Sequence, residues 1–257
     1  MGKYNSSTFR VTPLVNAIKA NQANFDKFIQ SVITTRVFPS LQCPTADDAY
    51  FYGDNEKKLK PPKQHLIDLV KYFASKQNHS SIVSGKERSA LFGLHGEDQQ
   101  KKAESKAIRL VQNTYDAPVL PKAWYILEGP SNPDIYIEGD DYVLICEGKW
   151  TESHITITTT HLKAPGESRN QMIRHIQGAL NATTKKVYAF YIVDKYCQYQ
   201  NDLTEAAFEQ QLEAETIKPL EKDDILSSFY GYTTWQDLEE AINGLVFLTK
   251  EQIDRLP

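Results

Sequence analysis

The stretch NPDIYIEGDDYVLICEGKW, residues 132–150, decides the fold class because it contains two strands joined by a tight turn. Apolar runs lie on either side of the Gly-Asp-Asp turn at 139–141, and glycine and aspartate are typical turn residues. The second run, YVLIC, is apolar on both faces, as expected for a strand that helices cover on both sides. We therefore predict a buried pair of strands at 134–138 and 142–150.

The elements on either side of this pair extend the prediction to an α/β core. Hydrophobic periodicity predicts a helix at 100–115 and a strand at 123–128 before it, and a helix at 168–182 and a strand at 187–193 after it. The last strand, VYAFYIV, is an almost continuous apolar run and is expected at the centre of the sheet. The predicted order over about residues 100–195 is αβββαβ, with a mixed sheet.

Residues 1–99 are predicted to form a mostly helical region packed on this core. Apolar residues recur at helical spacing after Pro13, and a second helix is predicted at about 63–76. Between them, the segment DDAYFYGDNEKKLKPP is rich in charges and ends in two prolines, which predicts a loop.

Residues 196–257 are predicted to form a C-terminal helical cap. Helices are expected at 203–215 and 235–242. Thr234 is a suitable N-cap for the second of these helices, and the Asn-Gly pair at 243–244 provides its end. We treat both flanking regions as additions to one core.

Composition and charge narrow the classes of protein to consider. Apolar residues make up 40% and charged residues 24% of the chain, which is ordinary for a globular protein. The formal net charge of -4 provides no overall attraction to phosphate, so nucleic-acid binding requires a local basic surface. The three cysteines form no CxxC pair, and no apolar run approaches the roughly 18 residues of a membrane span. We therefore expect a cytoplasmic protein without disulfides, cysteine-bound zinc or a membrane segment.

The register of the two strands brings ionisable residues together. If Glu138 pairs with Val143 across the four-residue loop, Asp134 lies opposite Glu147. Directly opposite residues have Cβ atoms roughly 4.5–5.5 Å apart, which allows two carboxylates to hold one cation. Lys149 lies two residues after Glu147 and therefore points to the same face.

A pair of neighbouring carboxylates indicates a metal site. Buried carboxylates repel each other unless a cation neutralises them, and one lysine does not balance two acids. Oxygen ligands with open coordination positions suit Mg²⁺, with Mn²⁺ as a substitute. Such a metal polarises a phosphodiester and lowers the pKa of a bound water, which a nearby lysine orients or deprotonates. The pattern therefore favours phosphodiester hydrolysis.

The Pro-Asp pair ending at Asp134, followed by Glu147-Gly148-Lys149, resembles the signature of the PD-(D/E)XK, or restriction-endonuclease-like, nuclease superfamily. The predicted αβββαβ order is the core of that superfamily, and the resemblance covers about residues 100–195. It implies that Asp134 and Glu147 bind Mg²⁺, that the Gly148 carbonyl adds a ligand, and that Lys149 assists the attacking water. The motif recurs by chance in other proteins, so its place on two strands and on one face carries the argument.

Three further residues are candidates for the site. Glu104 shares a helical stripe with Ile108 and is expected to face the sheet, and the resemblance implies a metal ligand there; the alternative is an ordinary acid at a helix start. Gln171 and His175 lie four residues apart on one helix face. The resemblance implies a polar residue from this helix near the phosphate, and the alternative is a solvated helix surface.

Basic and aromatic residues provide candidates for nucleic-acid binding. The basic residues that could contact phosphates are Lys163, Arg169, Arg174, Lys185 and Lys186. The tyrosines that could stack on bases are Tyr50, Tyr52, Tyr230 and Tyr232. For both sets, a solvated surface or core packing is the alternative.

The sequence thus predicts a Mg²⁺-dependent endonuclease that hydrolyses DNA phosphodiester bonds in restriction or DNA processing. RNA is not excluded as substrate, and a homodimer is compatible with the resemblance. The chain contains no HExxH, GxGxxG, GxxxxGK[ST] or GxSxG motif, which removes support for zinc-protease, dinucleotide-binding, ATP-binding and serine-hydrolase functions. Two alternatives stay open: a nuclease-fold nucleic-acid-binding module with little or no catalysis, and an unrelated α/β protein in which Glu147 and Lys149 form a structural ion pair.

Overall fold

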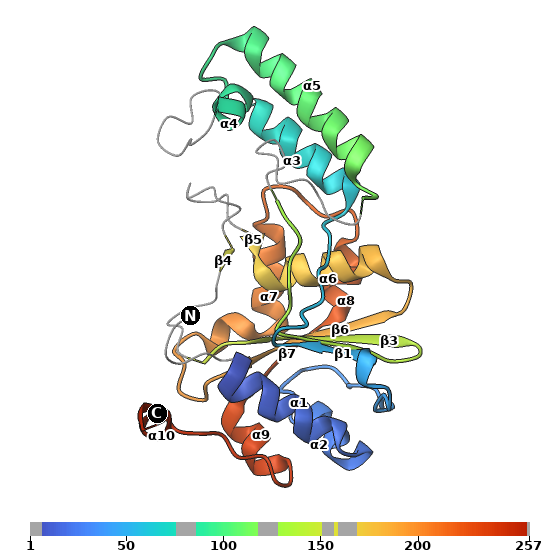
Figure 1. Ribbon diagram of the computed structural model, residues 1–257, viewed down its shortest axis with the longest axis vertical. Helices are drawn as coiled ribbons and strands as arrows, with labels where there is room; N and C mark the ends of the chain where they lie inside the picture. Colours follow the sequence, from blue (N-terminus) through green and yellow to red (C-terminus); the bar gives the residue numbers. More distant parts are fainter. Residues whose placement is uncertain (1–6, 76–85, 118–127, 151–156, 159–168, 256–257) are drawn as a thin grey trace.

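The centre of the molecule is an open, mixed five-stranded sheet (Figure 1). The computed structural model describes residues 7–75, 86–117, 128–150, 157–158 and 169–255. In spatial order, the strands are β1 (Tyr50–Tyr52), β2 (Ile135–Glu138), β3 (Tyr142–Gly148), β6 (Lys186–Val193) and β7 (Phe229–Thr234). Neighbours among β1, β2 and β3 are antiparallel, whereas β3, β6 and β7 run parallel. The α/β class is therefore as predicted.

The hairpin of β2 and β3 has the predicted register. Glu138 lies opposite Val143, and the Gly139 amide donates a hydrogen bond of 3.0 Å to the Tyr142 carbonyl, which closes the turn. The strands predicted at 142–150 and 187–193 are confirmed as β3 and β6, which pair in parallel. All residues of β3 are buried, as its apolar sequence requires.

Helices cover both faces of the sheet, in two layers that Figure 1 shows below and above the strands. The lower layer is α1 (Thr12–Lys19), α2 (Gln22–Gln30) and α9 (Trp235–Ala241). The upper layer is α6 (Gln171–Ala182), α7 (Glu205–Glu213) and α8 (Lys222–Ser228). Side chains alternate along β3, so Leu144 and Cys146 pack toward α1 and α2, whereas Val143 and Ile145 pack toward α6. Residue 147 therefore faces α6.

The N-terminal region supplies part of the core. The helical pattern after Pro13 is divided into α1 and α2 at Asn21, whose side chain accepts a hydrogen bond from the Asn24 amide and begins α2. The loop prediction for DDAYFYGDNEKKLKPP is wrong near its start, because β1 pairs there with β2 as an edge strand. A strand of three residues is too short to show the alternation that identifies a strand in a sequence.

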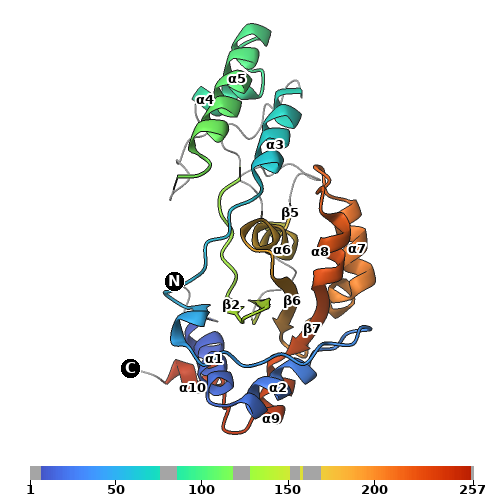
Figure 2. The ribbon, with the colours of Figure 1, turned by 90° about the vertical axis from the view of Figure 1, so that its right-hand side faces the viewer.

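Three helices pack on one another outside the two layers, and we call them the helical arm: α3 (Lys63–Ser75), α4 (Lys86–Leu91) and α5 (Glu97–Thr114). The helical arm lies beyond α6, on the opposite side of the sheet from α1 and α2 (Figure 2). Its core joins Phe73 and Phe92 to Ala103 and Ala107 of α5. The helix predicted at 100–115 is therefore present as α5, but the expectation that it covers the sheet is wrong.

The C-terminal region contains α7 and α9 as predicted, and Thr234 caps α9 by accepting a hydrogen bond of 3.0 Å from the Asp237 amide. It also contributes the edge strand β7, so it is more than the helical cap that was predicted. The strand predicted at 123–128 lies outside the described residues, except for Glu128. Short elements complete the fold: η1 (Ser7–Val11), η2 (Asp47–Ala49), β4 (Ile157–Thr158), β5 (Arg169–Asn170), η3 (Gln200–Leu203) and α10 (Lys250–Asp254). Among the described helices, none has both the length and the apolar composition to cross a membrane.

Candidate active site

The candidate site lies where β2 begins and β3 ends, on the face of the sheet that α6 covers. Glu147 and Lys149 alternate with the apolar residues of β3 and its continuation, so both point toward α6. The Lys149 Nζ donates a hydrogen bond of 2.7 Å to Glu147 Oε1. Both residues are buried, with an exposed fraction of 6% for Lys149 and 3% for Glu147. A buried ion pair of this kind is costly to desolvate, and its presence needs an explanation.

Asp134 lies one residue before β2, beside the end of β3. Its Oδ2 accepts a hydrogen bond of 2.8 Å from the Gly148 amide, which holds the carboxyl against the strand that carries Glu147. Burial, together with the negative charge of Glu147, raises the pKa of Asp134 well above its ordinary value. The two acids are therefore electrostatic neighbours, as the predicted register requires.

The N-terminal part of α6 completes the site. The side chain of Asn170 accepts hydrogen bonds from the Met172 and Ile173 amides and caps the helix. This start places Gln171 and His175 on the face toward β3. Gln171 Oε1 accepts a hydrogen bond of 3.3 Å from Lys149 Nζ.

His175 contacts the second oxygen of Glu147. Its Nε2 lies 3.0 Å from Glu147 Oε2, and the imidazole is fully buried. Burial alone would raise the pKa of Glu147, but Lys149 and His175 outweigh burial and lower this pKa. Of the two candidates on α6, the structure thus brings both to the site, and His175 makes the closer contact with an acid.

The backbone after Glu147 is fixed from the other face of the sheet. The Trp235 Nε1 donates a hydrogen bond of 2.9 Å to the Lys149 carbonyl, and the Lys149 amide donates one of 2.7 Å to the Ile192 carbonyl. A Cβ on Gly148 would lie 2.9 Å from Trp235 Cζ2 and 3.4 Å from Asp134 Oδ2. Glycine is therefore favoured here because a Cβ would come too close to the Trp235 indole, whereas its contact with Asp134 would be an ordinary van der Waals distance.

The donor set suits a hard divalent cation. Among the described residues, no group of three or more His, Cys, Asp and Glu side chains is arranged to hold a metal ion. The donors are instead the carboxylates of Asp134 and Glu147, with the Gly148 carbonyl as the third expected ligand, and such oxygen ligands fit Mg²⁺ or Mn²⁺. Burial first and the charge of Glu147 second raise the pKa of Asp134, and Lys149 opposes this rise without cancelling it. Glu147 has to exchange one of its partners, Lys149 or His175, to accept a metal.

Glu104 is not part of this site. It lies on α5 in the helical arm and is partly exposed. The stripe that α5 buries contains Ala103, Ala107 and Val111, which pack within the helical arm rather than on the sheet. The periodicity identified the helix correctly, but the choice between two adjacent apolar stripes required knowledge of what the helix packs against.

The predicted phosphate-binding residues are mostly paired inside the protein. Arg169 and Arg174 are buried, and both donate to Glu128 Oε1, at 2.7 and 3.2 Å. Lys185 Nζ lies 3.1 Å from Glu138 Oε1. The prediction of a surface role for these two arginines is wrong. Lys186 is exposed, and Lys163 lies outside the described residues.

The tyrosines of the flanking regions contribute mainly to packing. Tyr50 is buried and donates a hydrogen bond to the Pro44 carbonyl. Tyr230 packs on Phe38 and Tyr188, on the face that α1 and α2 cover and thus opposite the site. Tyr52 and Tyr232 are partly buried against the two cores.

A buried polar cluster beside α6 was missed by the sequence analysis. Glu128 and Glu215 hold Arg169 between them, with Arg169 Nε 2.6 Å from Glu215 Oε2. His65 Nε2 lies 3.2 Å from Glu128 Oε2 and connects α3 to this cluster. The bonded pairs among these four residues are 41 to 104 positions apart in the chain, so no local pattern in the sequence reveals them.

Comparison of the chain with family models, with curated proteins and with solved structures finds no match. The geometry of the site is therefore the basis for a functional conclusion.

Proposed function

We propose that this protein is a Mg²⁺-dependent nuclease that hydrolyses DNA phosphodiester bonds. The observation that carries the proposal is the convergence of Asp134, Glu147 and Lys149 at adjacent ends of β2 and β3, on the face covered by α6. Two oxygen-donor acids beside one lysine are the groups that metal-dependent hydrolysis of a phosphodiester requires.

The order of elements around the site supports the same proposal. Helices α1 and α2, strands β1, β2 and β3, helix α6 and strand β6 follow one another as αβββαβ when the helical arm is treated as an insertion between β1 and β2. This is the order expected for a restriction-endonuclease-like core. In this assignment α1 and α2 take the place expected for α5, and β1 takes the place expected for a strand at 123–128, a segment that lies outside the described residues except for Glu128.

Each group of the site has a part in the reaction. A divalent metal, when bound, polarises the phosphate and lowers the pKa of a water. Asp134 and Glu147 would hold it through their carboxylates. Lys149, released from Glu147, would orient the attacking water, whose proton would pass to bulk water. The bond from phosphorus to the leaving oxygen would break as the new bond forms, and the leaving oxygen would take a proton from the Lys149 ammonium or from water. Gln171 and His175 keep the lysine and the glutamate in position through the contacts that they make now.

A cleavage assay tests the proposal. Supercoiled plasmid, linear duplex and single-stranded DNA are incubated with Mg²⁺ or Mn²⁺ and with the native chain, Asp134→Asn or Lys149→Ala. We expect metal-dependent cleavage that falls about 10²–10⁴-fold in each variant, the range for losing a positioned acid or base. Lys185→Ala is the matched control, because it removes a lysine-glutamate pair at the other end of the same hairpin. Nicking of plasmid would identify an endonuclease.

A structural role for the Glu147-Lys149 pair is the second candidate, because both oxygens of Glu147 already have partners in the protein. Binding of Mn²⁺ discriminates between the two functions. Native protein that binds no Mn²⁺ at the site and cleaves neither DNA nor RNA would support the structural pair. Protein that binds Mn²⁺ and DNA without cleaving would support a nucleic-acid-binding module instead.

A further inference from the structure

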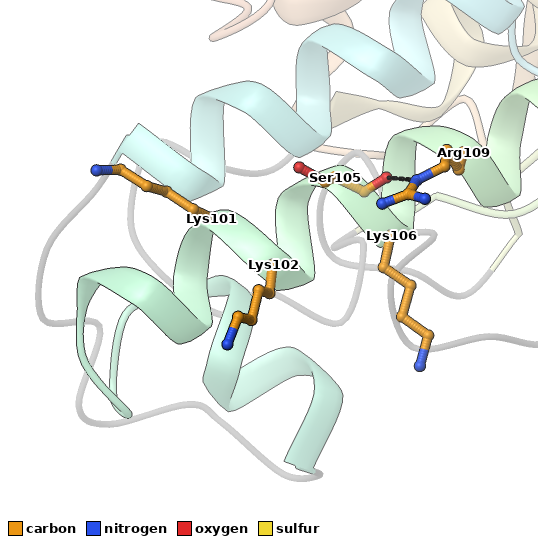
Figure 3. A pocket seen from close by; sticks show the side chains of 5 residues that line it. All are labelled: Lys101, Lys102, Ser105, Lys106 and Arg109. Carbon is orange, nitrogen blue, oxygen red and sulfur yellow. Dashed lines mark hydrogen bonds between the residues drawn. The ribbon is translucent and has the colours of Figure 1, made fainter.

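The exposed face of α5 gathers positive charge on a protein whose net charge is negative. Lys101, Lys102, Lys106 and Arg109 line, with Ser105, an open hollow of about 570 Å³ (Figure 3). We infer that these four cations, which we call the basic face of α5, bind the phosphate backbone of duplex DNA. This inference rests on the proposed nuclease function and assigns its substrate-holding surface.

The basic face is opposite the packed stripe of α5. At about 100° per residue, the four cations fall within an arc of roughly 140°, and Ala103 and Ala107 lie on the other side of the helix. Glu104 lies outside this arc. Glu97 pairs with Lys101 at 2.6 Å, but both side chains are largely exposed, so a phosphate can replace this acid at little cost.

The length of the basic face suits a phosphate backbone. From Lys101 to Arg109 the helix rises by about 12 Å, at about 1.5 Å per residue. One strand of duplex DNA presents a phosphate about every 3.4 Å along the axis, so three to four phosphates lie within this length. Four cations in this span match that number.

A second hollow extends the basic face toward α4. It has a volume of about 340 Å³, and Lys86 lines it together with Lys102 and Lys106. Glu87 is the one acid among its lining residues. Arg169 and Arg174 are buried in ion pairs with Glu128 and are therefore poorly placed to bind phosphate, and Lys185 pairs with Glu138.

The chemistry of the arc favours nucleic acid over a membrane surface. A helix that binds in a membrane interface needs an apolar face beside its cations. The apolar stripe of α5 is buried within the helical arm. The remaining residues on the arc are Asp98, Ser105, Gln112 and Asn113, all polar, with Asp98 the one acid among them. The helical arm also lies on the side of the sheet toward which Glu147 and Lys149 point, as Figures 1 and 2 show for α6 and the arm.

Binding of a labelled duplex tests the inference. Fluorescence anisotropy with a duplex of about 30 base pairs, in EDTA to prevent cleavage, is measured over a range of salt concentrations. One variant carries Lys101→Glu, Lys102→Glu, Lys106→Glu and Arg109→Glu. The matched control carries Lys27→Glu, Lys58→Glu, Lys250→Glu and Arg255→Glu, which change the net charge equally on other elements. Glutamate is a good helix former, so α5 is expected to persist, and circular dichroism checks this.

We expect the α5 variant to lower the affinity by at least about 10²-fold at low salt and to reduce the slope of log K against log salt by about 3 to 4, near 0.9 per lost phosphate contact. The control is expected to keep the native slope. Equal losses in both variants, or no binding of the duplex by the native protein, would overturn the inference. So would binding to phosphatidylserine vesicles in place of the duplex.

The outcomes separate this inference from the proposed function. One outcome is that the protein binds duplex through α5 and yet cleaves no nucleic acid with Mg²⁺ or Mn²⁺. That result would support DNA binding by the basic face of α5 and refute the proposed nuclease function. Metal-dependent cleavage with an unchanged KM for duplex in the α5 variant would support the nuclease and refute DNA binding by the basic face of α5.

Discussion

Gly148 shows how a single residue can hold the geometry of the candidate site. Its amide holds Asp134, and its missing side chain admits Trp235. The residue between Glu147 and Lys149 is therefore constrained by the Trp235 indole, although the motif leaves this position open to any residue.

Substitution Gly148→Ala should destabilise the protein and weaken metal binding together. The new Cβ would lie 2.9 Å from Trp235 Cζ2, so the indole or the strand has to move. We expect a loss of about 1–3 kcal/mol in the free energy of unfolding, as for other overpacked sites. Urea denaturation measures it, and Mn²⁺ titration measures the affinity. Gly129→Ala is the control, since its Cβ would meet nothing within 4 Å; an equal loss there would contradict the explanation.

Glu128 should make the stability depend on pH. Burial alone would raise its pKa, but Arg169, His65 and Arg174 outweigh burial and lower the pKa. A lowered folded-state pKa contributes stability that is present above the unfolded pKa of about 4.3 and is lost as the pH falls below it. Glu128→Gln should therefore be less stable than the native protein at pH 7, and the difference should shrink between about pH 5 and pH 3.

Urea denaturation at each pH measures this difference. Glu138→Gln is the control, because its ion pairs are partly exposed and solvent screens them. The pKa of Glu215 shifts in the opposite direction, because burial raises it more than Arg169 lowers it. Glu215 therefore contributes stability that is lost as the pH rises above about 4.3. A difference between native and Glu128→Gln proteins that does not change with pH would contradict the assignment.

At the scale of elements, α6 connects the buried polar cluster to the site. Asn170 lies between the two: its amide donates to Glu215, and its side chain caps α6 and accepts a hydrogen bond from the Tyr191 hydroxyl. The first turn of α6 then carries Gln171, and the next turn carries His175. The position of the helix start thus sets the contacts with Lys149 and Glu147.

Asn170→Ala should reduce cleavage more than its effect on stability explains. Loss of the N-cap is expected to cost about 0.5–2 kcal/mol, and a displaced helix start moves Gln171 and His175 away from β3. Thr204→Ala is the matched control, because Thr204 caps α7 through the Ala207 amide and lies away from the site. Unfolding experiments and cleavage rates are compared for both variants. Equal cleavage by the two variants would show that the start of α6 does not position the site.

At the scale of the whole molecule, the helical arm has a hydrophobic core of its own. Its buried residues form a cluster separate from the two cores on the faces of the sheet. Small cores open by local unfolding at a lower free energy than the global transition. The contacts of His65 with Glu128 and Arg169 connect the arm to the buried polar cluster beside α6.

Phe73→Ala should loosen the helical arm without unfolding the sheet. Phe73 is 2% exposed and packs against Phe92, and removal of a buried phenylalanine costs about 3–5 kcal/mol. Hydrogen exchange should show lost protection in α3, α4 and α5, with β3 and β6 unchanged. Phe190→Ala is the comparison, because Phe190 lies in the sheet core and should destabilise every element. Loss of protection throughout the chain in Phe73→Ala would show that the arm is no separate unit.

The sequence by itself determined the features that depend on neighbouring residues. The hairpin register follows from the turn at 139–141 and the alternation on each side, and it brings Asp134 beside the strand of Glu147. The buried run of β6, the helix α6 and the Thr234 cap also follow from local periodicity and capping chemistry. Such features depend on contacts a few residues apart, which a sequence displays directly.

Only the tertiary structure decided what each element packs against. The edge strands β1 and β7, the place of α5 in the helical arm and the pairing of Arg169 with Glu128 and Glu215 all depend on contacts between distant segments. A short edge strand has too few residues to show a period, and one helix can bury either of two adjacent stripes. The sequence does not distinguish a buried arginine from a surface arginine. In the fold, the acids that surround Arg169 identify it as buried.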